Sequence, residues 1–175
     1  MASTLEIIRP IFDTPTLPGL GPERRAEAWE LAEVEEKLTE LLTTSGVTGN
    51  SADKVRSAAL LWHDHLDASH EISQDIRDSD GSFLHGIMHR REPDYPNAKY
   101  WFNRTGTHAG FPEVAFRAKE ILMGSPLAEL ADGAWDSFGM VDAVAAAQKE
   151  ANEYELLQEI QKVEFEVLLV TIYRY

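Results

Sequence analysis

The sequence has 175 residues, a formal net charge of −14 and no cysteine, and 43% of its residues are hydrophobic and 26% charged. This composition is typical of a globular domain. The lack of cysteine excludes disulfides and thiolate metal sites, and the negative charge argues against a nucleic-acid partner because an acidic surface repels phosphates.

The length predicts a single domain over residues 1–175. No run approaches the roughly 18 consecutive apolar residues that a membrane span needs, so we expect no membrane partner. The N-terminus lacks the basic region followed by an apolar stretch that marks a secretory signal. Together with the absence of cysteine, this pattern predicts a cytoplasmic protein.

The first half of the chain predicts an extended segment followed by two helices. Residues 1–22 contain four prolines and two glycines, so we expect them to lie extended over the domain. Apolar residues spaced by three and four predict a helix over residues 23–44, which ends at Gly46. A second stripe of the same spacing predicts one continuous helix over residues 51–77.

Shorter helices are expected in the middle of the chain. Turn and breaker residues bound predicted helices at 82–91, 98–105 and 112–123. Near the C-terminus, residues 163–173 alternate like a strand but also keep a helical spacing, and we choose the helix because no other strand is evident. The predicted fold is therefore an all-α helical bundle with short irregular helices in the middle.

Histidine is confined to 46 residues of the chain, which is the strongest functional signal in the sequence. The six histidines are His63, His65, His70, His85, His89 and His108. On the predicted 51–77 helix, His63, Asp67 and His70 form a ridge at the edge of the apolar stripe, so that Asp67 could orient either imidazole. The alternative is a solvated stripe at the rim. His65 lies within the stripe and is expected to be a core histidine that donates to a carbonyl.

His85 and His89 are spaced i, i+4 on the predicted 82–91 helix, with Glu92 on the same face. Two imidazoles at that spacing can share a divalent metal ion, and Glu92 or another histidine (His70, His63 or His108) would supply the third ligand. Gly86 stands where zinc proteases of the His-Glu-x-x-His type carry their catalytic Glu, so that class is excluded. The structural alternative is that one histidine packs and the other hydrogen-bonds a carboxylate.

Residues 89–104 form a positive island of net charge +2 in this acidic chain. Guanidinium groups bind carboxylate or phosphate in a planar, bidentate geometry. The predicted ligand-binding residues are Arg90, Arg91, Asn97, Lys99, Tyr100, Arg104 and His108. The alternative is an internal network in which Arg90, Arg91 and Arg104 pair with the carboxylates Glu92, Asp94 and Asp67.

The same region resembles a family of uncharacterised proteins. The residues that carry the resemblance are the run HGIMHRREPDYPNAKYWF at 85–102, the spaced Arg104, Gly106 and His108, and the upstream SHEISQ at 69–74. The resemblance covers residues 60–110. It implies no activity, so no catalytic role carries over to this chain.

Three functions follow from these patterns, and the sequence leaves open whether the chain is an enzyme. The first is a His/Arg pocket for a small anionic molecule that bears phosphate or carboxylate, with His70, His85 or His89 as general acid or base. The second is a metal-dependent enzyme that uses His85 and His89. The third is a non-catalytic scaffold or interaction domain. The apolar C-terminal residues fit either the core or a homodimer face.

Overall fold

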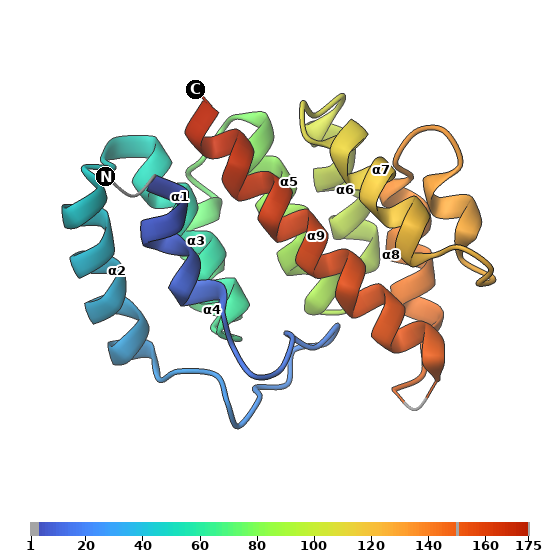
Figure 1. The fold of residues 1–175 in the computed structure, drawn as a ribbon, viewed down its shortest axis with the longest axis horizontal. Coiled ribbons are helices and arrows are strands. Elements are labelled where there is room, and N and C mark those ends of the chain that lie inside the picture. The colour runs from blue at the N-terminus through green and yellow to red at the C-terminus, as the bar shows by residue number, and fades with distance from the viewer. Residues whose placement is uncertain (1–3, 150, 175) are drawn as a thin grey trace.

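The computed structural model describes residues 4–149 and 151–174, and within these ranges the protein is an all-α bundle without a strand (Figure 1). The all-α prediction is confirmed. The helices are α1 (Thr4–Ile8), the 3-10 helix η1 (Arg9–Phe12), α2 (Leu31–Ser45), α3 (Gly49–Trp62), α4 (Leu66–Ser73), α5 (Ser79–Arg91), α6 (Tyr95–Thr105), α7 (Phe111–Ile121), the 3-10 helix η2 (Ala128–Ala131), α8 (Ser137–Ala146) and α9 (Asn152–Arg174). No helix among the described residues is both long and apolar enough to cross a membrane.

The 23-residue helix α9 crosses the molecule diagonally, with α1 to α4 on one side of it and α6 to α8 on the other (Figure 1). It contacts α3 and α5 as well as α7 and α8. Residues 163–173 are helical, as predicted. Their strand-like alternation has a simple cause, because a helix that packs on several sides buries residues outside a single stripe.

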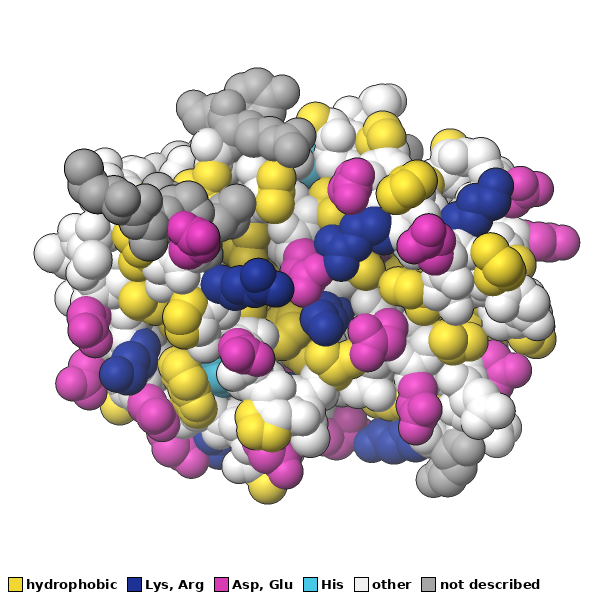
Figure 2. Space-filling view, in the orientation of Figure 1, with side chains coloured by type: hydrophobic (Ala, Val, Ile, Leu, Met, Phe, Trp, Pro, Cys, Tyr) yellow, Lys and Arg dark blue, Asp and Glu magenta, His cyan; other side chains and the backbone are white. Residues whose placement is uncertain are grey.

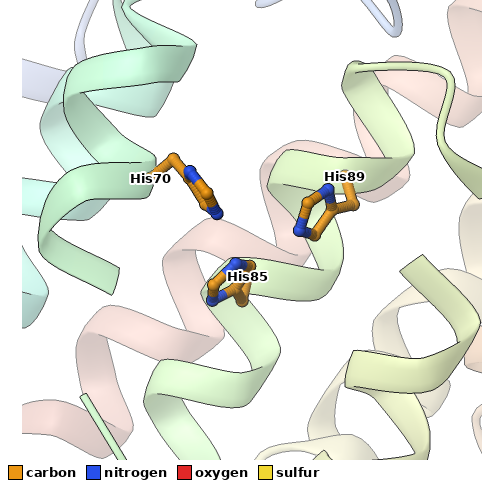
Figure 3. A group of neighbouring side chains, drawn as sticks. All are labelled: His70, His85 and His89. Atoms are coloured by element: carbon orange, nitrogen blue, oxygen red, sulfur yellow. The ribbon is translucent and has the colours of Figure 1, made fainter. Parts of the chain in front are cut away.

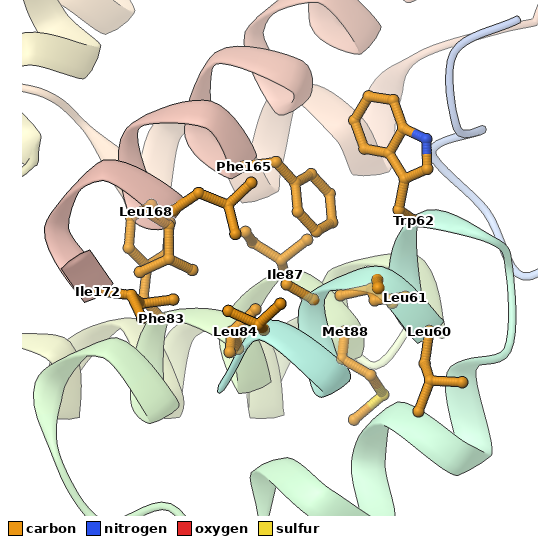
Figure 4. Packing of buried hydrophobic residues seen from close by; sticks show 14 of the residues in the cluster. Leu60, Leu61, Trp62, Phe83, Leu84, Ile87, Met88, Phe165, Leu168 and Ile172 are labelled. Atoms are coloured by element: carbon orange, nitrogen blue, oxygen red, sulfur yellow. The ribbon is translucent and has the colours of Figure 1, made fainter. Parts of the chain in front are cut away.

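Two hydrophobic clusters form the core, and α9 contributes to both. The first joins α2, α3 and α5 to Phe165, Leu168 and Ile172 of α9 (Figure 4). The second joins α7, α8 and η2 to residues of α9 that include Leu157 and Ile160. The apolar residues near the C-terminus, among them Leu168 at 0% exposure, are therefore core residues of this chain.

The predicted continuous helix over residues 51–77 is wrong, because the chain breaks between α3 and α4. Asp64 lies in the break with a positive φ of 66°. Its buried carboxylate accepts hydrogen bonds from the backbone N–H and Nε of Arg25, at 2.9 and 2.8 Å, and from an Nη of Arg91 at 2.7 Å. A helix through this point would carry the carboxylate away from both arginines.

The N-terminal predictions also need correction. Residues 1–3 lie outside the described part of the chain, but residues 4–12 form α1 and η1 rather than an extended segment. The helix predicted from residue 23 begins only at Leu31. One reason is that the backbone N–H of Trp29 donates to Nδ1 of His63 instead of to the carbonyl four residues before it, as a helix would require.

Helix α5 is the central helix of the fold, and every residue from Gly81 to Arg91 is buried. It begins at Asp78, whose carboxylate accepts a hydrogen bond from the backbone of Gly81 at 3.0 Å and so caps the helix. Helices α5, α6 and α7 correspond to the three short helices predicted in the middle of the chain, with ends shifted by up to three residues.

Two consecutive arginines tie the end of α5 to the rest of the molecule. Arg90 makes a bidentate pair with Glu164 of α9, at 3.1 and 2.5 Å, and both side chains are fully buried. Arg91 pairs with Asp64 and also donates to the carbonyls of Leu61 and Gly21, at 2.6 and 3.1 Å. Burial raises the pKa of Asp64, but Arg91 and Arg25 outweigh it and hold that pKa below its usual value.

We predict that Asp64→Ala destabilises the protein by about 3–5 kcal/mol, because it leaves two arginines without their buried counter-charge. For a chain of this size the melting temperature should fall by roughly 10 °C. The matched control is Asp67→Ala, which removes an exposed carboxylate three residues away and should cost no more than about 1 kcal/mol. Calorimetric melting of both variants measures the difference, and equal losses would contradict the role given to Asp64.

Candidate metal centre

Three of the six histidines converge at the contact between α4 and α5. Figure 3 shows the rings of His70 from α4 and of His85 and His89 from α5 facing one another. Their ring centroids lie 4.7, 5.4 and 4.8 Å apart, and one nitrogen of each lies within 4.8 Å of the others. We call this group the three-histidine cluster. It unites the three residues predicted as catalytic and two of those predicted as metal ligands.

Local structure explains how the cluster forms. The i, i+4 spacing places His85 and His89 on one face of α5, with their rings stacked at an interplanar angle of 17°. Gly86 lies beside His85, and a Cβ there would come within 3.0 Å of the Phe102 ring. The glycine therefore lets α6 pack closely against α5, which brings Trp101 of α6 against His85.

His85 is the buried floor of the cluster. It is 1% exposed and stacks on the Trp101 indole at 3.8 Å with an interplanar angle of 7°. Burial and, to a smaller extent, the nearby imidazoles of His89 and His70 together lower the pKa of His85 to about 3. Within the described part of the chain, neither ring nitrogen of His85 makes a hydrogen bond of normal geometry, although the backbone of Ser73 lies near enough to oppose the fall in its pKa. An imidazole that is neutral, fixed and at most weakly hydrogen-bonded is in the state that binds a metal ion.

His89 is oriented by polar neighbours. Its Nδ1 lies 2.9 Å from a carboxylate oxygen of Glu92, and its Nε2 lies 3.1 Å from the Asn97 amide nitrogen. Burial lowers the pKa of His89, and Glu92 opposes that shift. If Nδ1 donates to Glu92, then Nε2 is the nitrogen left to bind a metal, which is the carboxylate–histidine–metal arrangement of many metalloproteins. In this arrangement Glu92 orients His89, and its predicted role as the third metal ligand stays a prediction.

A second group of potential ligands shares His89. Oxygens of Glu92 and Asp94 lie with a nitrogen of His89 within 4.8 Å of one another, but both acids are exposed. Exposed carboxylates keep their hydration at little cost, so this group gives a weaker reason to expect an ion than the buried imidazoles do.

Arg90 and Arg91 were predicted to bind a ligand, and the structure places both in the core at 0% exposure. Their carboxylate partners are Glu164 and Asp64, which differ from the acids that the internal-network alternative proposed. A ligand would have to displace these ion pairs. The two arginines are therefore structural residues of the core and do not line an open ligand pocket.

The remaining histidines lie outside the cluster and are engaged elsewhere. His63 is fully buried: its Nε2 donates to the carbonyl of Ile11 at 2.8 Å, and its Nδ1 accepts from the backbone of Trp29 at 3.1 Å. His65 donates to the Trp29 carbonyl at 2.9 Å, in agreement with its predicted structural role. The break at Asp64 separates His63 from His70, so the predicted ridge with Asp67 does not form.

His108 was predicted as a ligand-binding residue and a possible third metal ligand. It is 3% exposed, its Nε2 lies 2.8 Å from the Asp80 carboxylate, and its Nδ1 accepts from the backbone of Gly110 at 3.0 Å. Asp80 in turn pairs with Lys54 at 2.6 Å. Both nitrogens of His108 are thus occupied, and it belongs to a separate polar network.

The other predicted ligand-binding residues lie on α6. Lys99 forms an ion pair with Asp142 at 2.6 Å, while Tyr100 and Arg104 are exposed. The Arg104 guanidinium lies 5.3 Å from the centroid of Trp101, the residue that also stacks on His85. The sequence signal for this contact is that Trp101 and Arg104 are spaced i, i+3 on the predicted helix over residues 98–105.

Comparisons with protein-family models, with curated proteins and with solved structures found no significant match to this chain. The resemblance expected for residues 60–110 therefore stays a prediction. The functional argument depends on the chemistry of the site itself.

We predict that His63 makes the protein sensitive to acid. Burial lowers the pKa of His63 to about 4, whereas an unfolded chain keeps a value near 6.5. As the pH falls below about 6.5 the unfolded state takes up a proton that the folded state does not, so stability is lost until the pH reaches about 4. Between pH 7 and 4, the free energy of unfolding of His63→Gln should fall by up to about 3 kcal/mol less than that of wild type. Urea unfolding at each pH measures this, and identical slopes for the two proteins would contradict it.

Proposed function

We propose that the protein binds one divalent transition-metal ion through His70, His85 and His89 and that the ion is the centre of its activity. The observation that carries the proposal is His85, a buried imidazole whose nitrogens make no hydrogen bond of normal geometry and which faces two further imidazoles. A buried polar group without a partner costs on the order of 1–3 kcal/mol. Such a cost is typical of sites kept for a ligand.

The ligand set favours a particular group of metals. Three neutral imidazoles without thiolate or carboxylate suit zinc, and also copper, iron and nickel, better than calcium or magnesium. When bound by three protein ligands, such an ion supplies an activated water or polarises a carbonyl or phosphoryl oxygen. His85 and His89 are buried, whereas His70 is half-exposed, so the His70 side is the one from which solvent or substrate would approach.

Residues around the cluster would keep its geometry rigid. Trp101 fixes the plane of His85 by stacking, and Glu92 orients His89 through its Nδ1. The amide of Asn97 lies against Nε2 of His89 and would have to move when a metal binds there. Orienting contacts of this kind commonly change metal affinity or activity by 10–100-fold in metalloproteins.

A small anionic substrate is the second part of the proposal. Arg104 is exposed, has no carboxylate partner in the described part of the chain, and lies over the indole that supports His85. Tyr100 lies next to it, with its hydroxyl 3.4 Å from an Nη of Arg104. Both residues were among those predicted to bind a phosphate or carboxylate, and unlike Arg90 and Arg91 they are exposed.

We predict that the chelator-treated protein takes up one equivalent of zinc and melts at a higher temperature. At a free concentration 100-fold above the dissociation constant the gain is about 2.7 kcal/mol, which corresponds to a shift of roughly 5–10 °C. His89→Ala should abolish both the zinc uptake and the rise in melting temperature. His65→Gln removes a histidine outside the cluster and should leave both unchanged. Elemental analysis and calorimetry are the measurements.

His85→Leu separates a metal site from a merely structural cluster. It should abolish zinc uptake and yet stabilise the metal-free protein by about 1 kcal/mol, because it removes poorly hydrogen-bonded polar atoms from the core. Loss of stability in the metal-free variant, or zinc uptake equal to wild type, would count against the proposed centre.

We predict that Arg104→Gln weakens binding of inorganic phosphate to the zinc-loaded protein by about tenfold, because it removes a charge-assisted contact. Zinc affinity should not change, since Arg104 lies outside the ligand set. Arg24→Gln is the control, because Arg24 is also exposed and contacts Ala28 and Glu30 rather than a residue of the cluster. Titration calorimetry with phosphate measures both. Equal phosphate affinity of wild type and Arg104→Gln would remove Arg104 from the anion site.

A further inference from the structure

A cleft lies between the N-terminal helices and helices α7 and α9, on the face shown in Figure 2. Its volume is about 640 Å³, within the range of small-molecule sites. Its apolar lining includes Phe12, Trp62, Ala109, Phe165, Leu169 and Val170. None of the three clustered histidines lines the cleft, so it is separate from the proposed metal centre.

Aromatic and aliphatic side chains form the floor of the cleft. Trp62 packs edge-to-face with Phe12 at 5.7 Å and with Phe165 at 5.4 Å between ring centroids. The indole Nε1 of Trp62 donates to the hydroxyl of Thr14 at 3.1 Å, so its polar atom is already satisfied. Trp62 and Phe165 are 2% and 1% exposed and close the cleft from below, so the apolar surface offered to an occupant is that of the half-buried Phe12 and Val170.

The walls carry charges of both signs. Arg117 of α7 and Glu166 of α9 neutralise each other in an ion pair at 2.5 Å. Four charged residues of the lining have no ion-pair partner in the described part of the chain: Arg9, Asp13, Glu113 and Lys162. Arg9 and Asp13 come from the N-terminal side, and Glu113 and Lys162 from α7 and α9. Each side therefore presents one cation and one carboxylate.

The geometry points to a small zwitterion with an apolar body, the chemical class of free apolar amino acids, as the occupant of this cleft. The apolar body would cover the aromatic floor, with the carboxylate of the ligand near Arg9 or Lys162 and its ammonium near Asp13 or Glu113. A purely anionic ligand would be repelled by the two carboxylates in a chain of net charge −14. A neutral apolar ligand would desolvate four charged groups without pairing them.

The test uses L-tryptophan as the probe and three analogues, added to the chelator-treated full-length protein. Tryptophan amide lacks the carboxylate, N-acetyltryptophan lacks the ammonium, and indole lacks both. We expect saturable binding of tryptophan, at least about tenfold weaker binding of each singly charged analogue, and no saturable binding of indole. Titration calorimetry measures the four affinities. Indole or N-acetyltryptophan binding as tightly as tryptophan would overturn the inference, as would the absence of tryptophan binding.

Variants place the binding in the cleft. If Lys162 faces the carboxylate of the ligand, Lys162→Gln should weaken tryptophan binding several-fold and leave the binding of tryptophan amide unchanged. Arg9→Gln tests the alternative cation in the same way. Ala109→Phe, at an exposed position of the lining, should block the cleft without altering its charge. Lys119→Gln, exposed on α7 outside the cleft, is the matched control. Unchanged tryptophan affinity in Ala109→Phe, or in both cation variants, would also overturn the inference.

Discussion

The structure depends on one buried carboxylate that two arginines share. Asp64 is fully enclosed, and the cost of burying its charge is offset only because Arg25 and Arg91 reach it together. The positive φ at this residue is the local consequence of that requirement. It ends α3, gives α4 its own direction, and holds the otherwise irregular segment before α2 against the body of the molecule.

The same arrangement makes α5 a rigid support for the three-histidine cluster. Arg91 connects its last turn to the Asp64 break, while Arg90, about 100° around the helix, connects it to Glu164 of α9. Both connections are buried and bear charge. Side chains on a helix held in this way keep their geometry without a ligand. Less conformational entropy is therefore lost when a ligand binds.

Patterns with a local cause could be predicted from the sequence. The helical class, the short helices after residue 78 and the i, i+4 pair of His85 and His89 all follow from spacing and breakers. The cluster with His70 was also among the predicted combinations. The partners of buried charges could not be predicted in this way: Arg90 and Glu164 are 74 residues apart, and several acids were equally plausible by spacing. His63 was misplaced because its partners are backbone groups of Ile11 and Trp29, which composition does not reveal.

Helix α9 has a consequence for the cooperativity of folding. Neither hydrophobic cluster is closed without it, because residues such as Phe165 and Ile160 complete opposite halves of the molecule. The halves therefore cannot behave as independent folding units, although each has its own core. Disturbance of one half is transmitted to the other through a shared element, and the protein should gain and lose its order as a whole.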